Sequence, residues 1–269
     1  MVALAVMTVV LGAVLMTFFR TSHQAERITD VADMRQSART AVQLMEREVR
    51  MAGSGWGRLQ VFGNTSTGLP DTLAAVSPGF GGATGNDSLK LVGAWQASTR
   101  IATGMPNASS ILKVDDVTGF ADGDLVIITD GSSAHMFQVT GVNASSENLQ
   151  HNPSSPYNSP GGHSNWPIGG YGVGASVFKI SITSYSFDAT SYRRPALIRH
   201  EYGRPPQVVA YNVNGFHTWY ELQDGTWTRS PANLSSIDKV APAVLTRVTD
   251  SRLPALTDSV WAAVQPRTF

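Results

Sequence analysis

Residues that could carry acid–base chemistry or bind a metal are scattered along this 269-residue chain. His200 and Glu201 are adjacent in a stretch that reads as a β-strand, so their side chains should point to opposite faces and could not act together. His151 and His163 lie on either side of a loop, with no third ligand at a spacing that suits zinc. We therefore name no catalytic residue and no metal ligand.

Acidic residues that could bind calcium gather between residues 115 and 124, but they lack the spacing of an EF-hand. Acidic residues beside glycine more often form turns; here they are Asp115, Asp116, Asp122 and Asp124. The sequence also lacks a phosphate-binding glycine loop with lysine, an HExxH motif and a GxSxG motif. We expect a protein that is not an enzyme and needs no cofactor. An anchored hydrolase is a minor alternative, because no nucleophile, base and orienting group can be assembled.

Composition narrows the class of partner. Lysine plus arginine and aspartate plus glutamate number 20 each, so no net charge would attract nucleic acid. Cysteine is absent, which excludes disulfides and thiolate metal sites. After residue 52 the chain is rich in Gly, Ser, Asn, Thr and Pro, as in loop-rich β proteins outside the cytoplasm.

The first 19 residues contain no charged side chain. A helix of that length approaches the ~30 Å core of a bilayer, so we predict a transmembrane segment. A signal peptide would need a basic start and a small-residue cleavage site, and neither is present. We expect this half of the helix to lie in an apolar environment through Val2, Ala3, Leu4, Val6, Met7, Val9, Val10, Leu11, Gly12, Val14, Leu15, Phe18 and Phe19.

The helical pattern continues beyond Arg20 with one apolar stripe, and Gly53 and Gly55 end it. The stripe spans only about three heptads and leads directly into the rest of the chain, so it suits packing on a sheet better than a free coiled coil. A plain membrane anchor followed by a stalk or coiled coil is the alternative. The predicted packing residues recur every three or four positions: Ile28, Val31, Met34, Ala38, Val42, Met45 and Val49.

Residues 53–269 read as a β-rich head. Short alternating or β-branched runs separated by turn residues continue to the C-terminus, and one of them is 177–187. Asn214–Gly215, between aromatic runs, is the strongest hairpin signal. We predict an α+β fold in which the N-terminal helix, residues 1–52, packs on an antiparallel sheet. A small β insertion is expected at 102–142.

The stretch 143–174 stands apart as a long loop rich in Ser, Asn, Pro and Gly. Loops of this length are usually functional or disordered. Its aromatic residues make it a candidate contact surface, although the same residues could instead tuck against the sheet. They are Tyr157, Trp166 and Tyr171.

Several segments resemble the type IV pilin family. The run MVALAVMTVVLGAVLMTFF is similar to the transmembrane half of a prepilin N-terminus. The segment MRQSARTAVQLMEREVRMAGSGWG is similar to the helix end of PilW-type minor pilins. Four further segments resemble head strands of the same group: NDSLKLVGAW, FADGDLVIITDGSSAHMFQVTGV, RPALIRHEYG and VVAYNVNGFHTWYEL.

The resemblance implies a pilin-like fold and a structural role as a minor pilin that helps to start a type IV pilus or sits at its tip. The implied partners are other major and minor pilin-like subunits, the inner-membrane assembly machinery, and the lipid bilayer before assembly. The implied location is the bacterial inner membrane, crossed once with the head in the periplasm, and then an extracellular filament. The missing cysteines also imply that the C-terminal disulfide loop common in major pilins is absent.

One feature of the family does not appear. Pilins carry a Gly-Phe-Thr-Leu-x-Glu stretch just before the apolar run, whereas this sequence begins inside that run. We expect Met1 to be an internal methionine of a longer gene product. Two alternatives stay open: a type II secretion pseudopilin of the large, tip-associated kind, and a membrane-tethered extracellular binding module that holds a glycan or another surface ligand.

Overall fold

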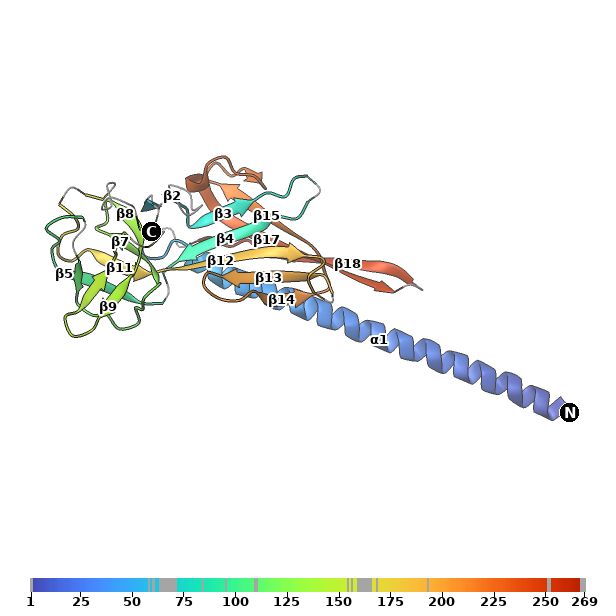
Figure 1. Cartoon of the computed structure of the whole chain (residues 1–269). Coiled ribbons are helices and arrows are strands. Elements are labelled where there is room, and N and C mark those ends of the chain that lie inside the picture. The colour runs from blue at the N-terminus through green and yellow to red at the C-terminus, as the bar shows by residue number, and fades with distance from the viewer. Residues whose placement is uncertain are drawn as a thin grey trace.

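A computed structural model describes residues 2–57, 59, 61–62, 72–83, 85–94, 96–108, 111–153, 155, 157–158, 166–167, 169–192, 194–250 and 253–266. Side chains of residues 2–6, 8, 9, 27, 248–250 and 253–256 also lie outside the description. The chain forms one long helix followed by β-strands (Figure 1).

Helix α1 (Val2–Met51) is 50 residues long, which corresponds to about 75 Å. Good helix formers and the absence of proline allow this length. The helix ends where Gly53 adopts a φ of 77°, and the Gly53 N–H donates to the carbonyl of Val92 at 2.9 Å. The last turn of the helix is thereby tied directly to a strand.

The described strands form three sheets. The five-stranded sheet has the order β14-β13-β12-β4-β3, and all its neighbours are antiparallel. Its strands are β3 (Val76–Gly79), β4 (Ser88–Gly93), β12 (Ser181–Asp188), β13 (Ala196–Glu201) and β14 (Gln207–Tyr211).

The four-stranded sheet follows in the chain, with the order β16-β15-β17-β18. A short 3-10 helix, η2 (Leu234–Ser236), precedes its longest strand. The strands are β15 (Val213–Leu222), β16 (Trp227–Thr228), β17 (Ile237–Asp250) and β18 (Leu253–Trp261).

The third sheet has nine strands in the order β2-β1-β8-β7-β11-β5-β6-β10-β9 and lies at the end of the molecule farthest from the N-terminus (Figure 1). Its pair β1–β8 is parallel. The strands are β1 (Val61–Phe62), β2 (Thr72–Leu73), β5 (Ser98–Thr103), β6 (Leu112–Val114), β7 (Leu125–Thr129), β8 (Ala134–Gln138), β9 (Gly141–Asn143), β10 (Asn148–Gln150) and β11 (Ser176–Lys179).

The second half of α1 packs against β4, β14, β17 and β18, so it touches both smaller sheets. Their common core contains helix residues such as Met45 and Val49, Leu89 and Tyr185 of the five-stranded sheet, and Phe216 of the four-stranded sheet. The nine-stranded sheet contributes to two further cores: one of its own around Phe137 and Trp166, and one that it shares with Val92 of β4 and Ile182 of β12. Its strands β5 to β11 extend from Ser98 to Lys179, beyond the 102–142 expected for an insertion.

The predicted α+β, pilin-like fold with one antiparallel sheet is wrong. The chain is mostly β, with several sheets and a single described α-helix at its N-terminus. The prediction failed because local alternation of apolar residues marks strands but not the sheet that each strand joins. The predicted strand at 177–187, for example, is two strands, β11 and β12. They belong to different sheets, and the chain passes from one sheet to the other at Ile180.

The predicted transmembrane half of the helix is also wrong. Among the described residues, no helix is both long enough and apolar enough to cross a membrane. The apolar run ends at Phe19 and passes into Arg20, His23 and Glu26, whereas a spanning helix needs about 20 mainly apolar residues. The single-pass inner-membrane location that rested on this segment is therefore corrected as well.

Candidate functional site

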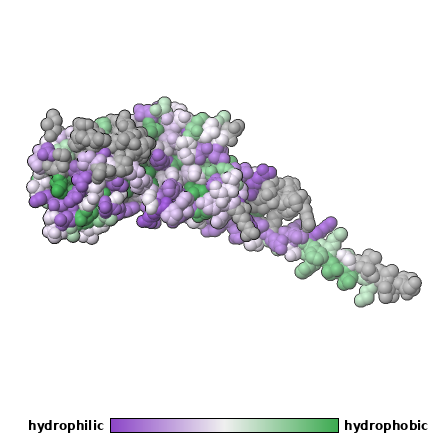
Figure 2. Space-filling model, in the orientation of Figure 1, coloured by the Kyte–Doolittle hydropathy of each residue, from purple (hydrophilic) through white to green (hydrophobic). Residues whose placement is uncertain are grey.

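The N-terminal half of α1 exposes a continuous run of large apolar side chains. It projects away from the sheets (Figure 1), and Figure 2 shows hydrophobic residues gathered along it. Met7 is 75% exposed and Phe18 is 66% exposed. The other large apolar side chains described here are also exposed: Val10, Leu11, Val14, Leu15, Met16 and Phe19. Exposed apolar surface on this scale usually marks a contact with another molecule.

Sequence reasoning placed thirteen residues in this half. Gly12 is exposed like its neighbours, and a Cβ added there would meet no atom within 4 Å. A glycine with open space around it would let a second helix approach closely. Five of the predicted residues, Val2, Ala3, Leu4, Val6 and Val9, lie in the helix with side chains outside the described ones.

The predicted stripe divides into a buried and an exposed part. Four of its members belong to the core beneath the two smaller sheets, namely Ala38, Val42, Met45 and Val49, and Met34 is also buried at 1% exposed. Val31 is half-buried. Ile28 is 71% exposed, so its predicted packing on the head is wrong.

A buried charge network, which sequence reasoning missed, fixes the helix to the five-stranded sheet. Glu48 of α1 is 5% exposed. Its Oε1 accepts from Nε of Arg199 at 2.9 Å and from Nη2 of Arg199 at 2.8 Å. Tyr185 donates its hydroxyl to Glu48 Oε2 at 2.7 Å. The available signal was a glutamate between the stripe residues Met45 and Val49.

The pKa shifts of Tyr185 and Arg199 keep both groups protonated, as their hydrogen bonds to Glu48 require. Burial, reinforced by the Glu48 carboxylate, raises the pKa of the Tyr185 hydroxyl, so the hydroxyl stays a donor. Burial alone would lower the pKa of Arg199, but its contact with Glu48 outweighs that effect and raises the pKa. A second carboxylate, Glu201, accepts from Arg199 Nη1 at 3.2 Å and completes the pairing. The arrangement holds a helix in place and offers no free acid or base.

The predicted contact loop does not present its aromatic residues to solvent. Trp166 is 5% exposed and Tyr171 is 1% exposed, and both belong to the core of the nine-stranded sheet. Trp166 stacks on His151 with ring centroids 5.2 Å apart. Tyr171 shares a hydrogen bond of 2.5 Å with Nδ1 of His135. The contact role is therefore wrong for these two residues.

Tyr157, the third aromatic of that loop, is half-buried and packs edge-on against Tyr202, with ring centroids 5.7 Å apart. It links the nine-stranded sheet to the end of β13 rather than standing free. Aromatic residues in a polar loop can equally be the core of a neighbouring sheet, and the nonlocal partners that decide between these roles cannot be read from the loop itself.

The other candidates for chemistry are not brought together. His200 is exposed, while Glu201 is bound by Arg199 and Ser181. Asp116 and Asp124 accept backbone N–H groups of their own turns, from Thr118 and Ala121. His163 lies outside the described residues. Within the described part of the chain, no three His, Asp or Glu side chains are grouped to hold a metal ion.

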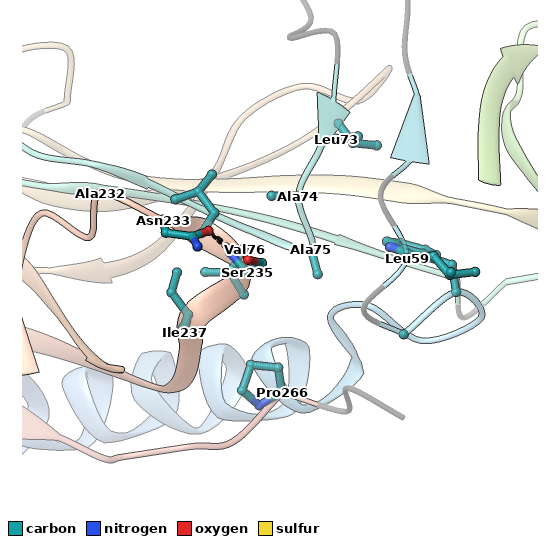
Figure 3. A pocket seen from close by; sticks show the side chains of 13 residues that line it. Leu59, Leu73, Ala74, Ala75, Val76, Ala232, Asn233, Ser235, Ile237 and Pro266 are labelled. Carbon is teal, nitrogen blue, oxygen red and sulfur yellow. Dashed lines mark hydrogen bonds between the residues drawn. The ribbon is translucent and has the colours of Figure 1, made fainter. Parts of the chain in front are cut away.

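A cavity of about 590 Å³ lies where the end of α1, strand β3 and helix η2 meet (Figure 3). The described residues that line it include Trp56, Val76 and Ile237, together with Asn233 and Ser235, and none is titratable. Asn233 uses its side-chain oxygen to accept from the Ser235 hydroxyl at 2.8 Å, an interaction within the cap of η2. The described lining therefore offers no acid, and no base that could activate the Ser235 hydroxyl.

No protein-family model matches the chain, and no curated protein matches it significantly.

Proposed function

We propose that this chain is a structural subunit of the minor-pilin type, which joins a filament by packing the exposed N-terminal half of α1 against the helices of other pilin-like subunits. The observation that carries the proposal is the projection of an apolar helical surface beyond the sheets while the rest of the same helix is locked into the core. The resemblance of residues 1–57 to pilin helices supports the same role.

The energetic argument rests on the cost of leaving this surface in water. Apolar surface gains about 25 cal/mol for each Å² that leaves water, so the exposed side chains favour any partner that covers them. Neighbouring helices can do this along their whole length, and Gly12 and Ala13 leave room for close approach. Glu48 and Arg199 keep the helix from turning relative to the head, so the head is carried at a fixed angle.

The proposed partners are therefore other pilin-like subunits, in a type IV pilus or in the related type II secretion pseudopilus. No covalent chemistry is needed for this role. It requires a helix whose exposed half gains apolar contacts with neighbouring helices while the head stays folded.

The proposal is tested by placing a charge on the exposed apolar surface. Leu11→Arg and Val14→Arg change side chains that the head does not cover, so circular dichroism and the thermal midpoint should stay those of the wild type. Incorporation into filaments sheared from the producing cells should fall at least about tenfold, because an unpaired charge in an apolar interface is costly. Gln24→Arg, at an exposed polar position of the same helix, is the matched control. Wild-type incorporation of both charged variants would overturn the proposal.

A further inference from the structure

Three tryptophans share the outer face of the four-stranded sheet. Along β15 the side chains alternate, with Phe216, Thr218 and Tyr220 buried toward α1, and His217, Trp219 and Glu221 on the opposite face. The strand register places Trp227 opposite Glu221, and it aligns Trp261 with Ala243, which is itself opposite His217. Trp219, Trp227 and Trp261 therefore lie on one face, here called the tryptophan row.

The tryptophan row runs diagonally across the sheet. From Trp227 to Trp219 is one strand and two residues, and from Trp219 to Trp261 is two strands and two residues in the same direction. With strands ~4.8 Å apart and ~3.4 Å per residue, the Cα steps are about 8 Å and about 12 Å. The three indoles are thus attached along one nearly straight line.

All three indoles are accessible, since Trp219 is 45% exposed, Trp227 is 42% exposed and Trp261 is 64% exposed. Between Trp219 and Trp261 the sheet carries only the small side chains of Ala241 and Ala243 on this face. The surface between the rings is therefore low and flat, without a socket for a protruding side chain.

Charge on this face is balanced apart from Arg247, which lies four residues beyond Ala243 on β17. Glu221 and Lys239 are opposite each other beside Trp227 and form an ion pair of 2.5 Å. A polyanion such as nucleic acid would need unpaired cations. Lys239 is instead neutralised by its partner. His217 lies two residues from Trp219 on the same face, so polar groups flank the row on both sides. Uncharged hydroxyl groups are the ligand chemistry that complements paired donors and acceptors of this kind.

We propose that the tryptophan row binds an extended, neutral, β-linked polysaccharide. The C–H faces of β-linked pyranose rings are apolar and pack on the electron-rich face of an indole. A straight line of separated indoles engages alternate rings of an extended chain. Glu221, Lys239 and His217 accept from or donate to the hydroxyl groups at the ring edges. This binding goes beyond filament assembly and uses a face remote from the exposed half of α1.

The test uses the full chain, kept soluble in a mild detergent because of its apolar helix, and measures its depletion from solution by microcrystalline cellulose and by chitin. Coiled, α-linked amylose coupled to beads is the discriminating ligand. We expect depletion by cellulose or chitin and none by amylose. Each of Trp219→Ala, Trp227→Ala and Trp261→Ala should lower the partition coefficient about tenfold. Trp219→Tyr should retain most of it.

Tyr211→Ala is the matched control, because Tyr211 is 48% exposed on β14 of the other small sheet. Its partition coefficient should equal that of the wild type, and all variants should keep the wild-type thermal midpoint. Three results would overturn the proposal: no depletion by cellulose or chitin, equal depletion of the tryptophan variants and the wild type, or binding to amylose alone. Loss of filament incorporation by the tryptophan variants without any polysaccharide binding would likewise assign the face to a protein partner instead.

Discussion

Arg229 donates two hydrogen bonds to the carboxylate of Asp87, and this pair joins the two smaller sheets. Its Nε donates to Oδ2 at 3.0 Å and its Nη2 to Oδ1 at 2.8 Å. The Asp87 carboxylate also accepts from the backbone N–H groups of Thr218 at 2.9 Å and Gly81 at 3.1 Å. Because Asp87 precedes β4 and Thr218 lies in β15, this one carboxylate fixes the edge of one sheet against the other.

The Asp87 network predicts a specific dependence of stability on pH. Burial alone would raise the pKa of Asp87, but the hydrogen bonds from Arg229, Thr218 and Gly81 outweigh it and lower the pKa. A lowered folded-state pKa means that the stabilisation is complete above the unfolded value, about 3.9, and is lost as the pH falls through the folded value. Asp87→Asn should therefore destabilise the protein at pH 7, and its difference from the wild type should narrow as the pH falls below the unfolded value and through the lowered folded value.

Urea unfolding of Asp87→Asn and the wild type between pH 7 and pH 2 provides the measurement. Asp122→Asn changes an exposed aspartate and serves as the control. A free-energy difference between Asp87→Asn and the wild type that stays constant down to the lowest pH would contradict the assigned role of the ionised carboxylate.

Removing Glu48 should be among the most destabilising single changes in the helix. Glu48→Ala leaves the Arg199 guanidinium, whose side chain is only 14% exposed, without its main partner, and breaking a buried pair in this way costs about 3–5 kcal/mol. Tyr185→Phe, which removes one hydrogen bond to the same carboxylate, should cost about 1–2 kcal/mol.

Chemical denaturation measures both changes in unfolding free energy. Glu46→Ala is the matched control, because Glu46 lies two residues before Glu48 in the same helix. Its carboxylate contacts Arg50 at 3.6 Å on the surface, an interaction worth about 0.5 kcal/mol. If Glu48→Ala cost no more than Glu46→Ala, the helix would be held by its apolar stripe alone.

Trp166 should stabilise the nine-stranded sheet without affecting the two smaller ones. It contacts Phe137, His151 and Tyr171 in a core that is separate from the core around α1. Trp166→Ala should cost about 3–5 kcal/mol there. Hydrogen exchange should show lost protection in β5 to β11 and unchanged protection in β12 to β17. Uniform loss over all three sheets would show that the two cores unfold as one unit, and Trp227→Ala is the exposed control.

The outermost ion pair between helix and sheet should contribute little to global stability. Arg35 Nε contacts Asp258 Oδ2 at 2.7 Å, with side chains 48% and 34% exposed. Such pairs contribute about 0–1 kcal/mol and are screened by salt. Arg35→Ala should leave the thermal midpoint nearly unchanged yet speed amide exchange in β18 near Asp258, and the effect should fade at high salt. A midpoint drop as large as that of Glu48→Ala would refute this ranking.

Local patterns in the sequence predicted the helix and most of the strands, but they did not predict how the strands assemble into sheets. No Gly, Pro, Asn or Asp interrupts residues 177–187, so no turn residue marks Ile180, where the chain leaves one sheet for another. The predicted hairpin at Asn214–Gly215 is instead a bulge within β15, and Asn212, with a φ of 58°, makes the turn. Turns and bulges use the same residue types, and the partner that decides, β17, lies later in the chain.

Only those parts of the candidate site that depend on local sequence could be predicted. The apolar character of residues 1–19 can be read from local sequence, and so can the apolar stripe from Met34 to Val49. The exposure of Ile28 depends on which strands pack on the helix, and those strands lie far away in the chain. The burial of Trp166 depends on strands far away in the chain. The tryptophan row depends on three strand pairings, which no single window of sequence contains.

The attachment of α1 also has a mechanical meaning. Glu48 and the Gly53 N–H connect the end of the helix to β13 and to Val92, and β4, β12 and β17 extend along the direction of the helix (Figure 1). A pull on the N-terminus would therefore load many strand hydrogen bonds at once in shear, rather than peel them one by one. The head would resist tension as a unit and transmit it toward the far sheet, while the free half of the helix would yield first.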